Sequence, residues 1–319
     1  MFRYIIRRIL LLIPVMLGVS FLVFFIMDLA PGNIIDTRIA ENGMTAEEAQ
    51  LLREQYNLTG SVLTRYLKYL SGLLHGDLGL SWVTGEPVMK SYLSRLPATI
   101  VLTSASILVS VVLSLPMGIL SAVRRGSFTD NTCMALSILG LSIPNFWLGL
   151  ILILTIALNV SWIPTSGFRG PASVILPAIT IGTGLTANLA RTTRSAMLDV
   201  LNQDYLRTER AKGSSELRVV MKFALSNALI PILTIAGGQF AACLGGSVLT
   251  ETVFAWPGVG RLIIDSVTAR DVPMIVGCVI MKSLGIGLVV LATDLLYAAA
   301  DPRIRAAYRW NELLRRKGK

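Results

Sequence analysis

The stretch ILLLIPVMLGVSFLVFFIMDL, residues Ile9–Leu29, carries a single charged side chain, Asp28. A helix of about 20 apolar residues spans the hydrocarbon core of a bilayer. Basic residues precede the run, as they do in a signal peptide. The run is nevertheless too long for a signal-peptide core, and Asp28–Pro31 makes a poor cleavage site. The stretch therefore predicts a retained membrane-spanning helix.

The remainder of the chain has the same character. Of its 319 residues, 53% are hydrophobic and 15% are charged, and the mean hydropathy is +0.66. Soluble proteins carry about 25% charged residues, so the composition excludes a soluble globular, disordered or coiled-coil protein. Five more apolar runs are predicted to span the membrane: Ile100–Val123, Cys133–Leu158, Val174–Ala190, Ala228–Leu249 and Met274–Ala300.

These runs predict an all-α polytopic membrane protein with six transmembrane helices. The expected parts are a tail and first span (1–29), an extracytoplasmic helical loop (30–98), a five-helix core (99–305) and a cytoplasmic tail (306–319). The net charge is +10. With the N-terminus in the cytoplasm, nineteen Lys and Arg residues lie inside and nine outside, which matches the positive-inside rule. Both termini are therefore expected in the cytoplasm.

Proline and glycine punctuate the predicted spans. Membrane helices tolerate proline where neighbouring helices satisfy the freed backbone groups, so Pro14, Pro116, Pro144 and Pro177 are expected inside helices. The pairs Gly237–Gly238 and Gly245–Gly246 predict close helix packing. A line of contact with the substrate is the alternative.

Helical signals also occur outside the spans. Thr45–Glu48 forms a capping box that predicts a helix toward Tyr56. A second amphipathic helix is predicted from apolar residues at helical spacing, namely Val62, Tyr66, Leu67, Leu70, Leu73 and Leu74. Both helices are expected to pack on the outer face as a small cap.

The cytoplasmic segment 191–227 combines a short polar helix over 204–213, a break at Gly213 and an amphipathic helix. The apolar face of that last helix is expected to contain Leu217, Val220, Met221, Ala224 and Leu225. Such a structured segment either docks a cytoplasmic partner or packs on its own helix ends. The spacing leaves both interpretations open.

The chain lacks the motifs of several other functions. It has no GxxxxGK[ST] loop, GxSxG or HExxH, so neither ATP hydrolysis nor another enzymatic activity is expected. Basic residues are not interleaved with aromatic ones, which argues against nucleic-acid binding. Within the spans, Lys282 and Asp294 are the main ionisable residues, and this scarcity of buried charge disfavours a self-sufficient secondary carrier.

No metal or cofactor site is expected in this chain. Cys133, Cys243 and Cys278 lie in or beside apolar runs without a CxxC spacing, as inert core thiols do. The single histidine, His75, cannot form a metal site alone. It is interpreted as structural, with a contact to nickel as the alternative if nickel were the cargo.

Residues Tyr205–Pro231 resemble the EAA loop of bacterial ABC importer permeases, in the form used by the dipeptide, oligopeptide and nickel branch. In place of the EAA triplet this chain has Arg207–Glu209, as that branch does, and Gly213 matches the motif glycine. Five other segments resemble the first of the two paired permeases of that branch: Met1–Arg8, His75–Gly79, Thr192–Leu198, Glu251–Arg261 and Asp301–Arg305.

The resemblance implies a type I ABC importer transmembrane domain in the bacterial cytoplasmic membrane. The partners would be a second permease, two cytoplasmic ATPases that hold ATP and Mg, and an extracytoplasmic binding protein. The residues that would couple the chain to an ATPase are Tyr205, Arg207, Thr208, Glu209, Arg210, Ala211, Lys212, Gly213, Ser214 and Leu217.

A second candidate site follows the fifth predicted span. Glu251, Phe254, Trp256, Pro257 and Arg261 are expected to contact the binding protein or to guard the outer entrance. The alternative is an interfacial aromatic anchor. Peptides are the expected cargo, with nickel or metal chelates and glutathione as alternatives.

Overall fold

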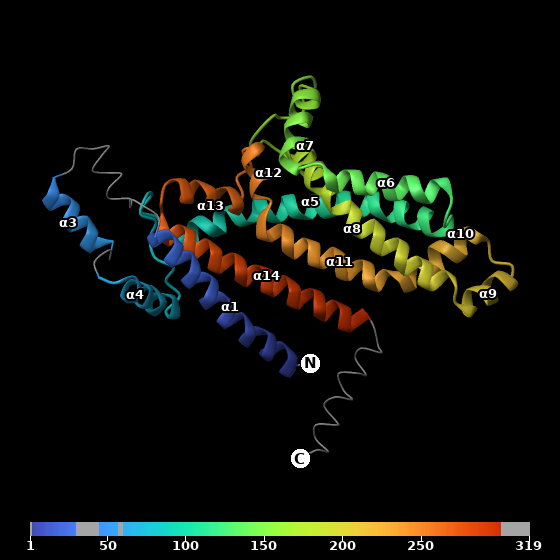
Figure 1. Ribbon diagram of the computed structural model, residues 1–319, viewed down its shortest axis with the longest axis horizontal. Coiled ribbons are helices and arrows are strands. Elements are labelled where there is room, and N and C mark those ends of the chain that lie inside the picture. The colour runs from blue at the N-terminus through green and yellow to red at the C-terminus, as the bar shows by residue number, and fades with distance from the viewer. Residues whose placement is uncertain (1, 30–44, 57–59, 301–319) are drawn as a thin grey trace, which may run out of the picture. The chain divides into compact units, whose positions relative to one another are not determined.

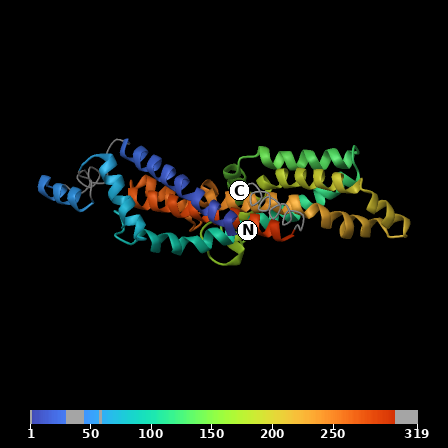
Figure 2. The same cartoon turned by 90° about the horizontal axis from the view of Figure 1, so that it is seen from below.

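The computed structural model describes residues 2–29, 45–56 and 60–300, and most of these residues are helical (Figures 1 and 2). The chain divides into two compact units. The first unit contains residues 100–256 and the chain from Leu288 onward, whereas the second contains residues 3–99 and 257–287. Two long helices, α5 (Val88–Val123) and α14 (Val272–Ala300), contribute residues to both.

The second unit also contains α1 (Phe2–Leu29), α3 (Ala46–Gln55), α4 (Val62–Leu74) and α13 (Val259–Thr268). The predicted capping box at the start of α3 is confirmed. The Thr45 amide donates to Glu48 Oε2 at 2.9 Å and the Glu48 amide donates to Thr45 Oγ1 at 3.3 Å. These hydrogen bonds lower the pKa of the Glu48 carboxyl group.

The second predicted amphipathic helix exists as α4, but its buried face is narrower than expected. Tyr66 is buried, whereas Leu67 and Leu74 are exposed. The helix α5 begins at Val88, eleven residues before the predicted boundary at residue 99. Asp271 ties the intervening loop to the start of α14, since its carboxylate accepts hydrogen bonds from the Trp82 amide and from Ser81 Oγ.

The first unit contains the remaining helices. They are α6 (Phe128–Ser142), α7 (Asn145–Leu152), the π-helix η1 (Ile153–Ala157), the 3-10 turn η2 (Pro171–Val174), α8 (Ile175–Leu201), α9 (Asp204–Ala211), α10 (Glu216–Arg218), the π-helix η3 (Val219–Ala224), α11 (Leu225–Gly246) and α12 (Val248–Val253). Figures 1 and 2 show α6, α8 and α11 running side by side.

Among the described residues, five helices are long and apolar enough to cross a membrane, and a bent helix pair raises the number to six. The prediction of six spans is confirmed in this sense. The five are Ile5–Leu29, Val88–Val123, Pro171–Leu201, Glu216–Gly245 and Val272–Leu295. Each of the five is longer than the roughly 20 residues that a bilayer requires. Several of them continue into segments that were predicted to be loops.

The third predicted span is broken rather than continuous. The helices α6 and α7 meet at 93°, and Pro144 is the first residue outside α7. The residue before a proline is pushed out of the helical region, and Ile143 is accordingly extended, with φ −83° and ψ 122°. The side chain of Asn145 fills the space that a Cβ on Gly184 of α8 would occupy, at 2.8 Å, so packing against α8 holds the bend in place.

Close helix packing was predicted at Gly237–Gly238, and the structure shows it at Gly237 only. A Cβ on Gly237 would lie 2.4 Å from Cγ2 of Thr293 in α14, whereas a Cβ on Gly238 would meet nothing within 4 Å. Gly237 therefore allows α11 and α14 to approach closely. Gly238 faces away from that contact.

These neighbouring glycines provide a matched test of packing. Gly237→Ala is expected to lower the free energy of unfolding by about 1–3 kcal/mol, because the added methyl group overpacks the contact with Thr293. Gly238→Ala adds the same methyl group in open space and is expected to be neutral or slightly stabilising. Thermal unfolding in detergent measures both. Equal losses would show that the α11–α14 contact is not close.

Candidate functional site

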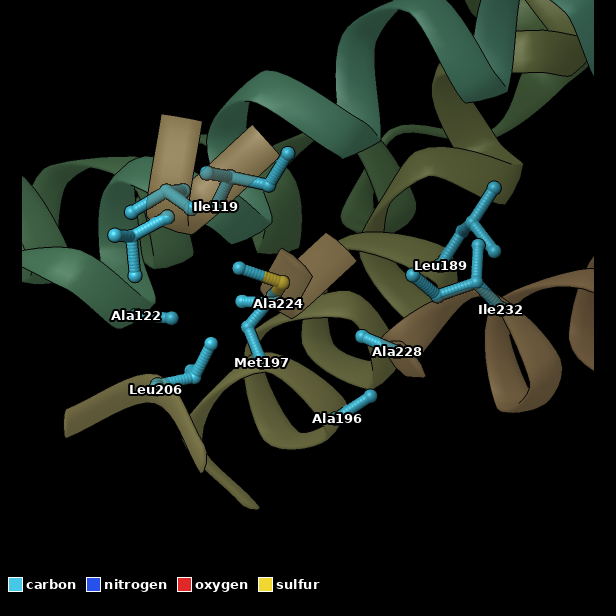
Figure 3. Close-up of a cluster of buried hydrophobic side chains, with 11 residues drawn as sticks. Ile119, Ala122, Leu189, Ala196, Met197, Leu206, Ala224, Ala228 and Ile232 are labelled. Atoms are coloured by element: carbon cyan, nitrogen blue, oxygen red, sulfur yellow. The ribbon is translucent and has the colours of Figure 1, made fainter. Parts of the chain in front are cut away.

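The short helix α9 is anchored to the first unit by one side chain. Leu206 is fully buried, while the other side chains of α9 are exposed or half-buried. It lies in a cluster of apolar residues contributed by α5, α8, η3 and α11 (Figure 3). The members are Ile119, Ala122, Leu189, Ala196, Met197, Leu206, Val219, Val220, Ala224, Ala228 and Ile232. Leu206 therefore packs α9 against a core shared by three long helices, α5, α8 and α11.

A tight turn follows α9 and centres on Gly213. The Ser214 amide donates to the Glu209 carbonyl at 3.2 Å and the Gly213 amide donates to the Arg210 carbonyl at 2.9 Å. These two bonds form a Schellman motif, which places its glycine in the left-handed region. Gly213 has φ +82°, and a Cβ there would meet nothing within 4 Å. The sequence requires glycine at this position because of the backbone conformation, not because of crowding.

An ion pair connects α9 to α10 across this turn. Arg210 donates from Nε and from a terminal guanidinium nitrogen to the two carboxylate oxygens of Glu216, at 3.0 and 2.9 Å. The hydrogen bonds to Glu216 raise the pKa of Arg210, so the pair stays charged. Lys212, the residue directly after α9, pairs with Glu209 at 2.8 Å. The Arg210–Glu216 pair fixes the direction of α9 relative to the long helix that begins at Glu216.

The exposed side of α9, the turn that follows it and α10 carries most of the remaining predicted residues. Tyr205, Thr208, Ala211 and Lys212 are exposed, as are Arg207 at 76% of its side-chain surface and Leu217 at 75% of the residue surface. Tyr205 accepts a hydrogen bond from the Asn227 amide at 3.0 Å. We call this surface, from Tyr205 to Leu217, the α9 surface.

The predicted apolar face of residues 217–225 is partly wrong. Leu217 and Met221 are exposed, and Val219 takes the buried position beside Val220 and Ala224. The reason is the π-helical turn η3, since its wider turn shifts the register by which side chains face the core. Val219 and Ala224, which lie five residues apart, are consequently both buried, together with Val220.

The Arg210–Glu216 pair predicts a local rather than a global effect. Glu216→Gln is expected to change the free energy of unfolding by less than about 1 kcal/mol, because the pair is exposed. The amides of Gly213 and Ser214 should nevertheless exchange their hydrogens several-fold faster, because the turn opens more often. Hydrogen–deuterium exchange measures this rate. Glu209→Gln, which breaks only the pair with Lys212, is the control, and equal rates in the two variants would contradict the assigned role.

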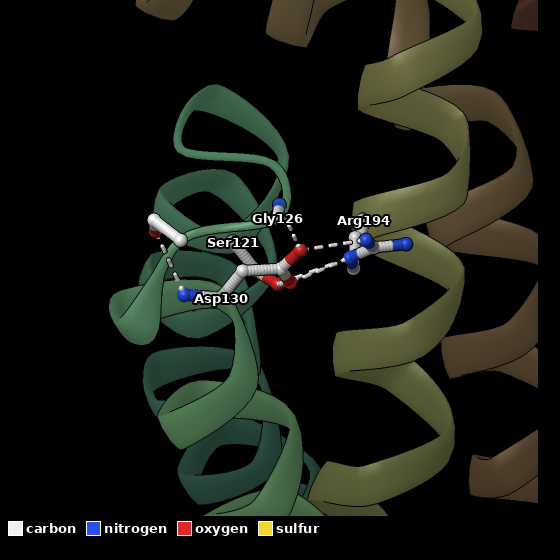
Figure 4. A network of polar contacts seen from close by, with 5 residues as sticks. Ser121, Gly126, Asp130 and Arg194 are labelled. Atoms are coloured by element: carbon white, nitrogen blue, oxygen red, sulfur yellow. Dashed lines mark hydrogen bonds and ion pairs between the residues drawn. The ribbon is translucent and has the colours of Figure 1, made fainter.

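A buried ion pair lies deeper along α8, near the anchor of α9. Arg194 donates to both oxygens of Asp130, from Nε at 2.8 Å and from a terminal nitrogen at 2.7 Å (Figure 4). Asp130 also accepts hydrogen bonds from Ser121 Oγ and, at 2.9 Å, from the Gly126 amide. One carboxylate therefore joins the end of α5, the α5–α6 turn and the start of α6 to α8. We call this network the Asp130 clamp.

The sequence interpretation did not identify the Asp130 clamp. Arg194 stands inside the segment Thr192–Leu198 that resembles the family, but the sequence predicted no role for Arg194 or Asp130. A signal did exist, because Asp130 and Arg194 each lie within four residues of the end of a predicted apolar run, and the two charges have opposite sign. Such charges are expected to pair when their helices pack together. Arg210 and Glu216 are likewise opposite charges that flank the predicted glycine break.

The second candidate site is largely buried. Glu251, Phe254 and Trp256 are almost fully buried. The Phe254 ring packs with Ala157, Ile163 and Leu176 and fills the space beside Gly149, and Trp256 meets Phe168 edge to face with ring centroids 5.0 Å apart. In this structure these three side chains are packed inside the chain, and the expectation that the set contacts a binding protein or guards the outer entrance stays a prediction. This packing excludes an interfacial aromatic anchor.

Pro257 and Arg261 belong to the second unit. Pro257 is half-buried. Arg261 lies in α13 and pairs with Asp265 at 3.6 Å, with 39% of its side-chain surface exposed. Arg261 is thus the residue of this predicted set whose charged group remains accessible.

Cys243 and Cys278 are free and buried, as core thiols are, whereas Cys133 is free and only half-buried. His75 caps the end of α4, and its Nδ1 lies 2.8 Å from the Ser71 carbonyl. Among the described residues, no group of three His, Cys, Asp or Glu side chains is placed to hold a metal ion.

Comparisons with known proteins were made on the whole chain. Residues 114–306 match the family described as binding-protein-dependent transport system inner membrane component, and residues 1–103 match the N-terminal family of the same membrane component. The oligopeptide transport system permease protein AppB of Bacillus subtilis (strain 168) is 42% identical over 315 residues, which is 95% of this chain and 99% of that protein. The glutathione transport system permease protein GsiC of Escherichia coli (strain K12) is 41% identical over 305 residues, 96% of this chain and 99% of that protein.

Solved structures share the fold. Two crystal forms of the methionine ABC transporter MetNI, in inward-facing conformations, superpose with TM-scores of 0.55 and 0.58 at 22% and 21% sequence identity. They cover 67% and 68% of this chain and 97% and 99% of the matched chains. At this identity the likeness establishes the architecture of the transmembrane domain.

Proposed function

Because this chain belongs to the binding-protein-dependent transport system inner membrane components, as a peptide-type ABC importer permease, we propose that its α9 surface receives the motion of a partner ATPase. The chain itself is the transmembrane permease subunit of such an importer. This membership replaces the alternative of a self-sufficient secondary carrier.

The observation that carries the proposal is the construction of α9. Its outer side is open to a partner, whereas Leu206 on its inner side lies in a core shared by α5, α8 and α11. The Gly213 turn and the Arg210–Glu216 pair keep α9 from pivoting freely. A partner that closes on α9 would therefore move the attached helices as a unit, which is what a rigid lever between two states requires.

The proposed assembly contains four kinds of chain. A second permease would complete the pathway, two ATPases would bind ATP and Mg, and a binding protein would deliver the substrate from outside. The family description supports this assembly, because it names a binding-protein-dependent system. The chain itself would bind no cofactor.

We propose short peptides as the cargo. Two relatives similar over almost their whole length are named as oligopeptide and glutathione permeases, and glutathione is itself a tripeptide. Neither name mentions nickel, which stays an untested alternative.

Uptake of a labelled tripeptide in cells with and without this chain tests the proposal. Loss of uptake in the deletion strain would support the proposal. In cells that contain the chain, inhibition of tripeptide uptake by excess unlabelled glutathione would show that glutathione shares the pathway, and no inhibition would show that it does not. Full uptake in the deletion strain would contradict the proposal.

The proposed orientation places the α9 surface in the cytoplasm and α13 outside. The helix α11 has 22 residues and is therefore about 33 Å long, which is close to the thickness of the bilayer hydrocarbon. Arg261→Cys should react with a membrane-impermeant maleimide in intact cells, and Lys212→Cys should react only after the membrane is opened. Both side chains are accessible in the structure, and the opposite labelling pattern would invert the topology.

A further inference from the structure

One face of α4 packs on the C-terminal half of α1. The Tyr66 hydroxyl donates to the Leu17 carbonyl at 2.9 Å and lies 2.8 Å from Ser20 Oγ. The Tyr66 ring also contacts Phe21 and Phe24, with centroids 5.2 and 5.6 Å apart. Figures 1 and 2 show α4 beside this half of α1. The contact is therefore extensive and holds α4 at one level along α1.

That level lies inside the membrane-spanning part of α1. The span covers Ile5–Leu29. Phe24 and Phe21 are five and eight residues before its end, which places them about 8 and 12 Å within the span at 1.5 Å per residue. Arg65, next to Tyr66, reaches in the other direction and pairs with Asp28. The axis of α4 thus crosses α1 below the end of the span rather than above it.

The surface of α4 that α1 does not cover has two rows of exposed side chains. Leu63, Leu67 and Leu74 form an exposed apolar row, and Thr64, Lys68 and Ser71 form an exposed polar row beside it. At about 100° per residue, the apolar row lies on the opposite side of α4 from Arg65. Because Arg65 points toward the end of α1, the leucines point toward the middle of the span.

We propose that α4 is an interfacial membrane helix, and that acyl chains of the leaflet in which α1 ends cover Leu63, Leu67 and Leu74. Helices of this kind lie in the plane of the interface and bury their apolar face about 5–10 Å, which matches the level of Phe24. The apolar row would lie at the same depth in the membrane as the lipid-facing surface of α1. The polar row beside it would contact the lipid headgroups. Lys68, in that row, has a side chain long enough to reach the headgroups.

This inference revises the expected cap. A cap in water would leave three leucines in solvent, whereas the contacts of Tyr66 place them at acyl-chain depth. A protein partner on the same row, or water, is the competing occupant. The inference depends on α1 spanning the membrane and not on the role assigned to α9.

Fluorescence quenching distinguishes these occupants. Leu67→Cys, in a background with the three native cysteines replaced by alanine, is labelled with bimane in the importer complex that copurifies with the chain and is reconstituted in liposomes. Leu22→Cys on α1 is the lipid-facing control, since Leu22 and Leu67 are both 56% exposed. Leu51→Cys on α3 is the aqueous control, because Leu51 is exposed on a helix that carries four charged residues.

Phospholipids brominated on their acyl chains are expected to quench the Leu67 label as strongly as the Leu22 label, while aqueous iodide quenches the Leu51 label alone. Quenching of the Leu67 label by iodide would place α4 in water, and quenching by neither agent would place a protein on it. Either result overturns the proposal. Leu63→Cys repeats the measurement if the Leu67 variant does not assemble.

Discussion

Gly213→Arg is expected to abolish ATP-driven uptake while leaving the chain inserted in the membrane at its normal abundance. Gly213 has φ +82°, and a residue with a Cβ costs about 1–2 kcal/mol in this region. The turn would relax away from that conformation and change the direction of α9. The new side chain would also stand on the α9 surface. Uptake in cells and the amount of chain in isolated membranes measure the two effects.

Two control variants separate conformation from bulk and from position. Asparagine tolerates the left-handed region better than most residues, so Gly213→Asn should retain much of the uptake. Gly85→Arg introduces the same side chain at φ +71°, also in open space, but in the second unit. It should lower uptake far less. Normal uptake by Gly213→Arg at normal abundance would remove the α9 surface from the mechanism.

Arg194→Ala is expected to cause the largest loss of stability among these variants. It leaves Asp130, which is 3% exposed, without its cation, and breaking such a pair costs about 3 kcal/mol. This value is at the low end of the usual range because the Arg194 side chain keeps 28% of its surface exposed. The expected fall in Tm is roughly 4–5 °C for a chain of 319 residues, measured by thermal unfolding in detergent.

Arg191→Ala is the matched control for this prediction. Arg191 is exposed on the same helix, one turn earlier, and its removal should change the free energy of unfolding by no more than about 0.5 kcal/mol. Asp130→Asn should fall between the two variants, because the amide keeps some of the hydrogen bonds but not the charge. Equal Tm values for Arg194→Ala and Arg191→Ala would show that the Asp130 clamp does not hold α5 and α6 to α8.

Much of the fold could be predicted from local patterns. Apolar runs identify the spans because the bilayer sets their length, and the capping box at Thr45 fixes the start of α3 through bonds between near neighbours. Gly213 was predicted as a break between two helices, and it follows α9 with φ +82°. In each case the deciding interactions lie within a few residues of one another.

The errors arose where distant residues decide the conformation. Pro14 stays inside α1 and Pro144 ends a helix, and the difference comes from packing of Asn145 on Gly184. The π turn that rotates Leu217 and Met221 outward likewise could not be predicted from the helical spacing of apolar residues. Trp256 and Glu251 were interpreted as surface residues because aromatic and charged side chains near a span end often are, whereas tertiary packing buries both.

Site-specific photo-crosslinking from position 207 tests most directly whether the α9 surface meets an ATPase. Arg207 is exposed, so a photoreactive residue there should assemble normally, and one at Leu51 serves as the control on the other unit. After irradiation of intact membranes and mass spectrometry, the crosslinked partner from position 207 is expected to be a chain with a phosphate-binding GxxxxGK[ST] loop, and no such chain should be captured from Leu51. Failure to capture an ATPase from position 207, in membranes where the chain supports uptake, would contradict the account.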